Sequence, residues 1–345
     1  MRSYEIIITD QNDKPKVVAG LFNGTFTSQT KSKTTIPGAL NVELDLPIYS
    51  WDAPLDGAAV RVWGVGLPLL SQATDFNPSF DNKKYCNIQI SGGMAKGLPL
   101  ANPKQFGVLL KGQIQQAFGN WQGTAQTLDF VVTFPSGTSR QPRNIIFNCK
   151  NGEPFAAAIK NTLNTAFKDL PKPPAISVNI DPKLIAYQDE PAYYENLAQF
   201  ASYLNEKSKS IIRNPNYYGI KIANNIDGSI RVYDGAVPVD KPTQIEFQDL
   251  IGQPTWIAPY TLGFKVVMRS GIQVGDRVLM PKVVPAQFKQ FGLALTTPQT
   301  QSQYKTTSNF QGEFTVAMVR HLGNFRQRDP NSWVTVIEAF STGSV

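Results

Sequence analysis

Residues 128–134 read LDFVVTF, residues 135–142 read PSGTSRQP and residues 153–167 read EPFAAAIKNTLNTAF, and the contrast between them decides the fold. In the first segment, apolar side chains recur at every second position and share one face of a strand: Leu128, Phe130, Val132 and Phe134. In the last segment they recur at every fourth position, as in one stripe of an amphipathic helix: Phe155, Ile159, Leu163 and Phe167. The segment between them, rich in proline, glycine and serine, predicts a linker between a β region and a region that contains helices.

The two-residue alternation also runs through the residues before this linker. It indicates strands at residues 39–46, 58–64 and 85–90, and Asn23-Gly24 between short β-rich runs predicts a tight hairpin turn. Such alternation is typical of half-buried antiparallel strands in a barrel or a sandwich. The glycine- and proline-rich segment from Ile90 to Pro103 is expected to be an extended loop. Residues 1–135 therefore predict an N-terminal β domain.

Residues 143–235 are expected to form a small α+β domain inserted between two β regions. The helix that contains Phe155 must end before the proline-rich residues 170–174. A second helix is expected from Pro191, which suits a first helical turn, to residue 205. Residues 218–233 then read as a hairpin around a turn-forming Asn-Ile-Asp-Gly segment.

Residues 236–345 return to a β pattern. Their clearest predicted strands are residues 243–247, 263–268, 273–281, 314–320 and 333–340. A Thr/Gln/Ser tract at residues 296–308 has no apolar periodicity and predicts a mobile or interface loop. The predicted fold is mainly β with an inserted α+β domain, and the two β regions could form one body or two similar ones.

The composition fits a globular protein with large polar surfaces. Of the 345 residues, 41% are hydrophobic and only 17% are charged, so the chain can bury sizeable cores. The net charge of +7 raises the possibility of nucleic-acid binding, but cations only slightly outnumber acids in each of the three regions. Because a phosphate-binding surface needs clustered cations, this even distribution indicates charges spread over the surface and at interfaces.

Cys86 and Cys149 are too few and too far apart for a disulfide framework or a zinc site. Both lie in apolar, strand-like contexts and are expected to be buried free thiols. The first residues contain only a short apolar run, which is far from a signal-peptide core, and no run predicts a membrane span. We therefore expect synthesis and folding in a reducing cytosol, and no membrane insertion.

The only histidine, His321, excludes a histidine-based metal cluster and leaves a single candidate for a catalytic triad. It follows the predicted strand 314–320 and precedes a turn, and no G-x-S-x-G nucleophile motif accompanies it. A structural histidine held by a hydrogen bond explains this position better than a catalytic one.

Two glycine patterns resemble nucleotide-binding loops only in part. Gly64-Val65-Gly66 follows a predicted strand but lacks the third glycine, and no helix is expected after it. Gly92 and Gly97 have the separation of a phosphate-binding loop, but Leu-Pro stands where Lys-Ser/Thr is needed to hold phosphate and magnesium. Neither pattern predicts a cofactor site.

Paired carboxylates perform glycoside hydrolysis, so the closely spaced acids of this chain are candidates for such a site. Glu43 and Asp45 lie two residues apart on a strand, so both are expected on its solvent face. Asp75 and Asp81 flank an aromatic, proline-containing loop and could converge. The tryptophans are scattered among strands and turns and indicate core and interface anchors rather than a nucleic-acid platform: Trp51, Trp63, Trp121, Trp256 and Trp333. We expect no catalytic, cofactor-binding or metal-binding residues.

Several diffuse motifs resemble the hub proteins of bacteriophage baseplates. They lie mainly in the last two thirds of the chain: Asn151–Pro154 opening a helix, the helix at 191–205, Tyr217–Ile220 with the hairpin to Asp234-Gly235, the segment FQDLIGQPTW at 247–256, Ile272–Asp276, and residues 310–339. The resemblance covers roughly residues 143–340 by motifs and residues 1–135 by strand pattern. Hubs of type VI secretion systems are a distant related class. No fused needle or lysozyme domain is evident, so puncturing and digestion would belong to other proteins.

The resemblance implies a homotrimer in which each subunit contributes two tube-like antiparallel β-barrel domains, residues 1–135 and 236–345, with the α+β domain 143–235 packed outside. Such a ring would adapt a hexameric tail tube to a three-fold spike and line the channel for genome ejection. The implied partners are the tail tube or tube-initiator protein, the spike, other baseplate proteins, the tape-measure protein and, transiently, passing DNA. The implied location is the virion tail baseplate, assembled in the host cytoplasm. The alternatives are a tail-associated cell-wall hydrolase and a weak nucleic-acid-binding module.

Overall fold

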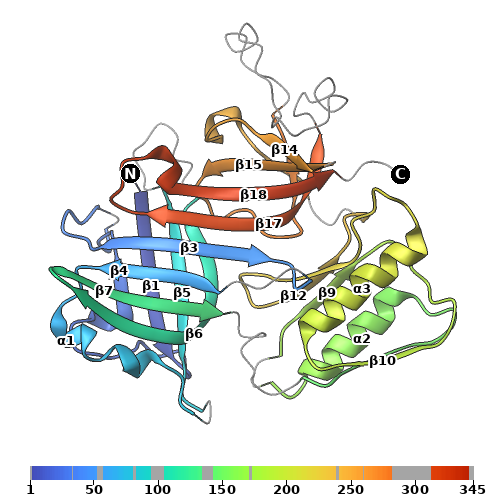
Figure 1. Cartoon of the computed structure of the whole chain (residues 1–345), viewed down its shortest axis with the longest axis horizontal. Helices are drawn as coiled ribbons and strands as arrows, with labels where there is room; N and C mark the ends of the chain where they lie inside the picture. Colours follow the sequence, from blue (N-terminus) through green and yellow to red (C-terminus); the bar gives the residue numbers. More distant parts are fainter. Residues whose placement is uncertain are drawn as a thin grey trace, which may run out of the picture.

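The computed structural model describes residues 2–32, 34–52, 57–80, 83–94, 105–133, 143–170, 173–237, 241–258, 260–281 and 312–341. Within these residues, one 13-stranded sheet forms a β body, and two small sheets with two long helices form an α+β body beside it (Figure 1). The mainly β fold with large antiparallel sheets, predicted from the alternation of apolar residues, is confirmed.

Seven strands of the large sheet come from the first 133 residues: β1 (Arg2–Asp10), β2 (Thr25–Thr27), β3 (Asn41–Tyr49), β4 (Ala58–Trp63), β5 (Cys86–Met94), β6 (Gly107–Gln122) and β7 (Ala125–Thr133). Their order is β3-β4-β7-β6-β5-β1-β2, and all their pairings are antiparallel. Alternation decides their faces, because in β3 the side chains of Val42, Leu44 and Leu46 are buried while Glu43 and Asp45 point outward and are only half-buried.

Strand β6 folds this region over onto itself. Its first half, up to Gln113, pairs with β5, and its second half, from Gln113 on, pairs with β7; a register shift between Ile114 and Gln116 lies just after this changeover. Such a bulge increases the local twist and bends the strand. Strands β1 and β5 therefore cross behind β3, β4 and β7 (Figure 1). A single apolar core fills the space between, with Phe76 packed edge-on against Phe130 at a ring-centroid distance of 5.4 Å.

The C-terminal strands continue the same sheet: β13 (Thr243–Gln244), β14 (Thr255–Ala258), β15 (Thr261–Val267), β16 (Arg277–Leu279), β17 (Glu313–Asn324) and β18 (Trp333–Ser341). The N-terminal half of β17 pairs with β16, and its C-terminal half pairs with β3, from Met318 opposite Tyr49 to Asn324 opposite Glu43. The question left open by the sequence is thus answered, because the two β regions share one sheet and one core.

The α+β body has its own apolar core, distinct from that of the large sheet. Its elements are β8 (Ile145–Cys149), α2 (Phe155–Phe167), β9 (Ile176–Asn179), β10 (Glu190–Tyr194), α3 (Leu197–Ile212), β11 (Lys221–Asn224) and β12 (Ile230–Tyr233). Helix α2 and the β11–β12 hairpin lie where the periodicity and the turn signal predicted them.

The predicted start of the second helix at Pro191 is wrong. Residues 190–194 form strand β10, because β8 offers an antiparallel partner in which Pro191 lies opposite Asn148. Helix α3 begins at Leu197, after Asn196, whose side-chain oxygen accepts a hydrogen bond from the Gln199 N–H at 2.9 Å. This N-cap therefore satisfies one of the backbone N–H groups in the first helical turn that have no partner within the helix.

Several contacts join the α+β body to the β body. Trp51, just beyond the end of β3, inserts into the α+β core and donates its backbone N–H to the Ile222 carbonyl at 2.7 Å. Tyr218 stacks on Phe340 of β18 with ring centroids 4.2 Å apart. Lys221 forms an ion pair with Asp52. The α+β body is therefore attached to strands from both β regions.

Some predicted loops fall outside the described residues. Strand β5 continues to Met94, so the loop predicted from Ile90 starts later, and residues 95–103 lie outside the described part. The same holds for Phe134, the linker at residues 135–142 and the tract at 296–308. Among the described residues, none of the helices has the length and apolar character needed to cross a membrane.

Candidate assembly surfaces

His321 is placed inside the core rather than at a turn. Strand β17 runs on to Asn324, so the predicted strand end before His321 is wrong, because β3 and β18 both supply partners for these residues. The side chain is only 1% exposed, and its Nδ1 lies 2.9 Å from Thr335 Oγ1. Burial lowers the pKa of His321 to about 3, so the ring is neutral at neutral pH. This geometry supports a structural role.

The candidate acids do not form a catalytic pair in the described residues. Asp45 accepts two hydrogen bonds from Arg320, at 2.7 and 2.6 Å, and Glu43 accepts one from Asn324 at 2.9 Å. Asp75 is exposed in a short 3₁₀ segment, whereas Asp81 lies outside the described residues. Convergence of Asp75 with Asp81 therefore stays a prediction.

The glycine patterns have structural explanations. A four-residue helix, α1 (Leu67–Leu70), does follow Gly66, which corrects the expectation of no helix there, but its single turn offers no extended phosphate cradle. Gly92 lies in β5, where an added Cβ would come within 2.7 Å of the Leu109 side chain. Gly97 lies outside the described residues.

Both cysteines are buried free thiols. Burial raises the pKa of each, to about 11 for Cys149, so neither thiol is in its reactive thiolate form at neutral pH. Among the residues that the structure describes, no group of three or more His, Cys, Asp or Glu side chains is arranged to hold a metal ion.

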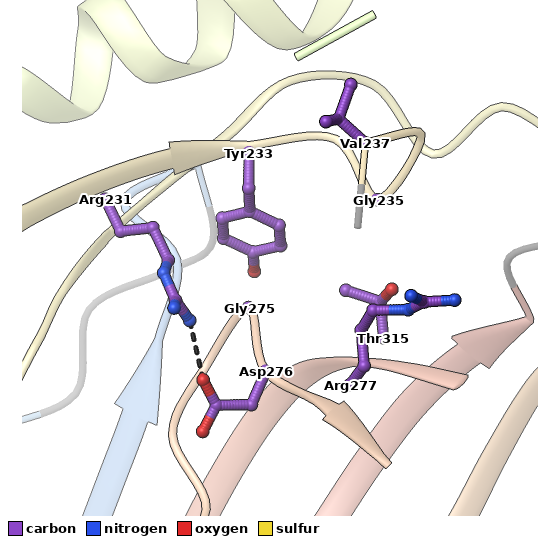
Figure 2. Close-up of a pocket in the computed structure, with 8 residues that line it drawn as sticks. All are labelled: Arg231, Tyr233, Gly235, Val237, Gly275, Asp276, Arg277 and Thr315. Carbon is purple, nitrogen blue, oxygen red and sulfur yellow. Dashed lines mark hydrogen bonds and ion pairs between the residues drawn. The ribbon is translucent and has the colours of Figure 1, made fainter. Parts of the chain in front are cut away.

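Two cavities lie near the α+β body. The first, between the end of β12 and β16, has a volume of about 20 Å³, which is room for about one water molecule (Figure 2). There Arg231 forms an ion pair with Asp276 at 2.7 Å across the boundary between the two bodies. The second, of about 300 Å³, lies between α2 and the start of β8, where the Arg143 guanidinium sits over the Phe167 ring. The first cavity is a narrow seam between the two bodies, and the second is lined by one cation, one acid and uncharged side chains.

The large sheet has an outer face, defined here as the side of strands β14, β15, β18, β17, β3, β4, β7 and β6 that points away from the core. These eight strands are hydrogen-bonded in that order. Cross-strand pairing aligns Glu43, Arg61 and Asp129 in one row, and Arg61 forms an ion pair with Asp129. Arg320 and Asp45 form a second pair on the same face. The sequence did not predict these contacts, because the partners lie on distant strands.

Both ends of this eight-strand run are strand edges without charged side chains. At one end, β14 (TWIA) pairs only with β15, and Ile257 is 48% exposed. At the other end, β5 pairs with β6 only as far as Gln113, so residues 116–122 (QAFGNWQ) have a strand neighbour on the β7 side alone among the described residues. Trp121 is 63% exposed there. The middle of this β6 edge is covered, because the Ala117 N–H donates to Asn77 Oδ1 and Leu70 lies against Gly119. Exposed edges of soluble proteins usually carry charges or proline that prevent pairing, so β14 and the end of β6 around Trp121 are candidate assembly surfaces.

No protein-family model and no curated protein matches the chain. Among solved structures, it is similar to the 43 kDa tail protein of prophage MuSo2 from Shewanella oneidensis, with 8% identity, coverage of 98% of this chain and 97% of that one, and a TM-score of 0.45.

A tail protein from Neisseria meningitidis MC58 gives 10% identity, coverage of 99% and 97%, and a TM-score of 0.47. A half-lidded PdpA–VgrG complex from Francisella gives 9% identity, coverage of 100% of this chain and 59% of that one, and a TM-score of 0.45.

Proposed function

We propose that this chain is a structural baseplate hub subunit of a phage tail, not an enzyme. In this proposal it forms a trimeric ring that adapts the hexameric tail tube to the three-fold spike and lines the channel for genome ejection. Its partners would be the tube or tube-initiator protein, the spike, other baseplate proteins and the tape-measure protein. It would assemble in the host cytoplasm and reside in the virion tail.

One observation carries this proposal: both β regions of the chain form a single run of eight strands that ends in two uncharged edges. Because antiparallel edges satisfy each other's backbone groups, β14 of one copy would pair with the end of β6 around Trp121 in the next copy. This contact is heterologous, so it builds a ring when the rotation between copies closes. Each copy supplies two β regions, so three copies would present six to the tube and keep three-fold symmetry toward the spike.

The remaining observations are consistent with a structural role. The only histidine is neutral and buried, and on the outer face Asp45 is held by Arg320 and Glu43 by Asn324. The α+β body is attached beside the sheet by Trp51 and Tyr218, where it would leave both edges of the eight-strand run accessible. Nothing in the described residues favours the hydrolase alternative.

The edge contact is tested by placing a charge on it. Ile257→Lys puts a cation on the edge strand β14, where pairing with another copy would have to bury it. Ile146→Lys is the matched control, because Ile146 is 69% exposed on β8 of the α+β body. We expect the wild type and the control to have the mass of a trimer in light scattering, and Ile257→Lys to be a folded monomer. A trimeric Ile257→Lys variant would contradict the edge contact.

The hub itself is tested separately by electron microscopy of tail particles labelled with antibody to this protein. We expect the label at the end of the tube that carries the baseplate. A wild-type protein that stays monomeric, together with label elsewhere on the particle, would refute the proposal.

A further inference from the structure

The cavity at the start of β8 contains a guanidinium group. It has a volume of about 300 Å³ and is lined by Arg143 and Asn144, which precede the strand, and by Thr162, Thr165 and Ala166 of helix α2. Pockets that hold small ligands begin at about this volume. The cavity therefore has the size of a binding site, and Arg143 decides which chemical group it fits.

Arg143 has no anionic partner among the described residues. Its guanidinium lies over the Phe167 ring, 5.4 Å from the centroid, and its buried Nε has no hydrogen-bond partner. No described carboxylate lies within ion-pair distance of it, and residues 134–142, which precede it in the chain, contain no Asp or Glu. Burial lowers the pKa of Arg143, and no neighbouring acid offsets this effect. A half-buried guanidinium remains charged, and leaving it without an anion is costly, so the cavity favours an anionic group.

The other groups at the cavity indicate which kind of anion fits. Asn144 has a left-handed backbone with a φ of 50°, and its Oδ1 accepts a hydrogen bond from the Tyr193 hydroxyl, so the cavity wall is polar but uncharged here. Asp169 also lines the cavity and is exposed. This acid would repel a phosphate group, which carries nearly two negative charges, more than a carboxylate, which carries one. The two oxygens of a carboxylate also match the fork of a guanidinium.

A strip of exposed, uncharged side chains leads away from the cavity. Ile146 and Asn148 point outward from β8, and Tyr193 and Pro191 lie directly opposite them on β10. Ile146 is 69% exposed and Tyr193 is 56% exposed. Single exposed apolar side chains are common, but an exposed cross-strand pair beside a cavity with an unpaired cation is a feature of interaction sites.

We propose that this cavity and strip bind an extended segment of a partner protein. An aspartate or glutamate side chain of the segment enters the cavity and accepts hydrogen bonds from Arg143. Apolar or aromatic side chains next to that acid pack on Ile146 and Tyr193. A free small carboxylate would fill the cavity but leave the strip uncovered, which is why the ligand is a protein segment. The site lies wholly within the α+β body, so it goes beyond the proposed function and does not depend on the ring.

The first experiment uses an array of short peptides of random sequence, probed with the wild-type protein. We expect the bound peptides to share an Asp or Glu flanked by aliphatic or aromatic residues. One such peptide is then labelled, and its affinity is measured by fluorescence anisotropy in three versions, with Asp, Asn or phosphoserine at the acidic position. The Asp version should bind at least about tenfold more tightly than the Asn version, and more tightly than the phosphoserine version.

Variants of the protein then test each part of the site. Arg143→Gln should weaken binding of the Asp peptide at least about tenfold and leave binding of the Asn peptide almost unchanged. Lys160→Gln is the matched control, because it makes the same charge change at an exposed α2 position that does not line the cavity, and it should bind as the wild type does. Asp169→Asn should bind the Asp peptide as well as the wild type or more tightly.

Two further variants test the shape of the site without changing its charge. Ala166→Leu fills the cavity while keeping a good helix former, and it should also weaken binding about tenfold. It serves in place of Arg143→Gln if that variant fails to fold, as judged by circular dichroism. Ile146→Ser should weaken binding roughly fivefold through loss of apolar contact on the strip.

Several results would overturn the proposal. They are an array without any bound peptide, bound peptides that share no acid, a phosphoserine peptide that binds most tightly, and affinity that is the same for Arg143→Gln or Ala166→Leu as for the wild type. Loss of the wild-type oligomer in Arg143→Gln would also overturn it, because the cavity would then hold an acid of a second copy.

The oligomeric state of the wild type separates this proposal from the hub function. If trimers form but no acidic peptide binds at Arg143, only the binding site fails. If the peptides bind as expected but the wild type forms no trimer or ring, the hub function fails and the binding site stands.

Discussion

Replacing Phe147 by alanine is expected to destabilise the α+β core by about 4 kcal/mol. The Phe147 ring on β8 is fully buried, and its centroid lies 5.4 Å from that of Phe200, 5.9 Å from that of Phe155 and 6.0 Å from that of Tyr203. Truncation of a buried phenylalanine to alanine costs about 3–5 kcal/mol, and loss of the contacts with three aromatic neighbours keeps this site away from the lower end of that range.

The location of the effect is more informative than its size. Phe147 belongs to the core of the α+β body, whereas Phe130, which is 1% exposed, belongs to the core of the large sheet. Because the two cores are separate, Phe147→Ala should lower the free energy of opening in residues 145–233 and leave the large sheet protected. Phe130→Ala should do the reverse.

Hydrogen exchange followed by mass spectrometry measures this directly, with urea denaturation giving the total loss of stability. We expect faster exchange of the α2, α3 and β8 amides in Phe147→Ala and of the β4, β6 and β7 amides in Phe130→Ala. If both variants accelerate exchange equally in both bodies, the two cores unfold as one unit and the reasoning is refuted.

Two further predictions concern a buried titratable group and a close backbone contact. Burial lowers the pKa of His321 to about 3, so the ring stays neutral in the native state at pH 5, whereas in the unfolded chain it binds a proton below about pH 6.5. The contribution of His321 to the free energy of unfolding is therefore fully present above about pH 6.5, and the free energy of unfolding should fall by about 2 kcal/mol by pH 5. Urea denaturation at pH 7 and pH 5 should show this loss in the wild type and a smaller one in His321→Gln, and equal losses would contradict it. Gly219 and Gly228 both have positive φ, 82° and 84°, but only at Gly219 would a Cβ meet other atoms, 2.5 Å from Asn205 Nδ2. Gly219→Ala should therefore cost roughly 2 kcal/mol more than Gly228→Ala in thermal unfolding, and equal melting temperatures would show that the contact relaxes freely.

Local periodicity was sufficient for the elements that bury one regular face. Alternation in β3 and β7 and the four-residue spacing in α2 correctly predicted their type, because each side chain's exposure follows from its position along a single element. The same reasoning failed at Glu190–Tyr194, where proline suggested a helix start but a free partner strand, β8, made a strand. No local pattern reports the presence of such a partner.

The sequence by itself determined a mainly β chain with a helical insertion, two buried thiols and no recognisable catalytic motif. Only the tertiary structure decided that the two β regions share one sheet, because that depends on β17 meeting β3, and that Trp51 belongs to the α+β core. It also decided the pairing of Arg320 with Asp45, 275 residues apart. The physical reason is that side-chain periodicity records which face of an element is buried, whereas the identity of its neighbour is set by strand pairing between segments far apart in the chain.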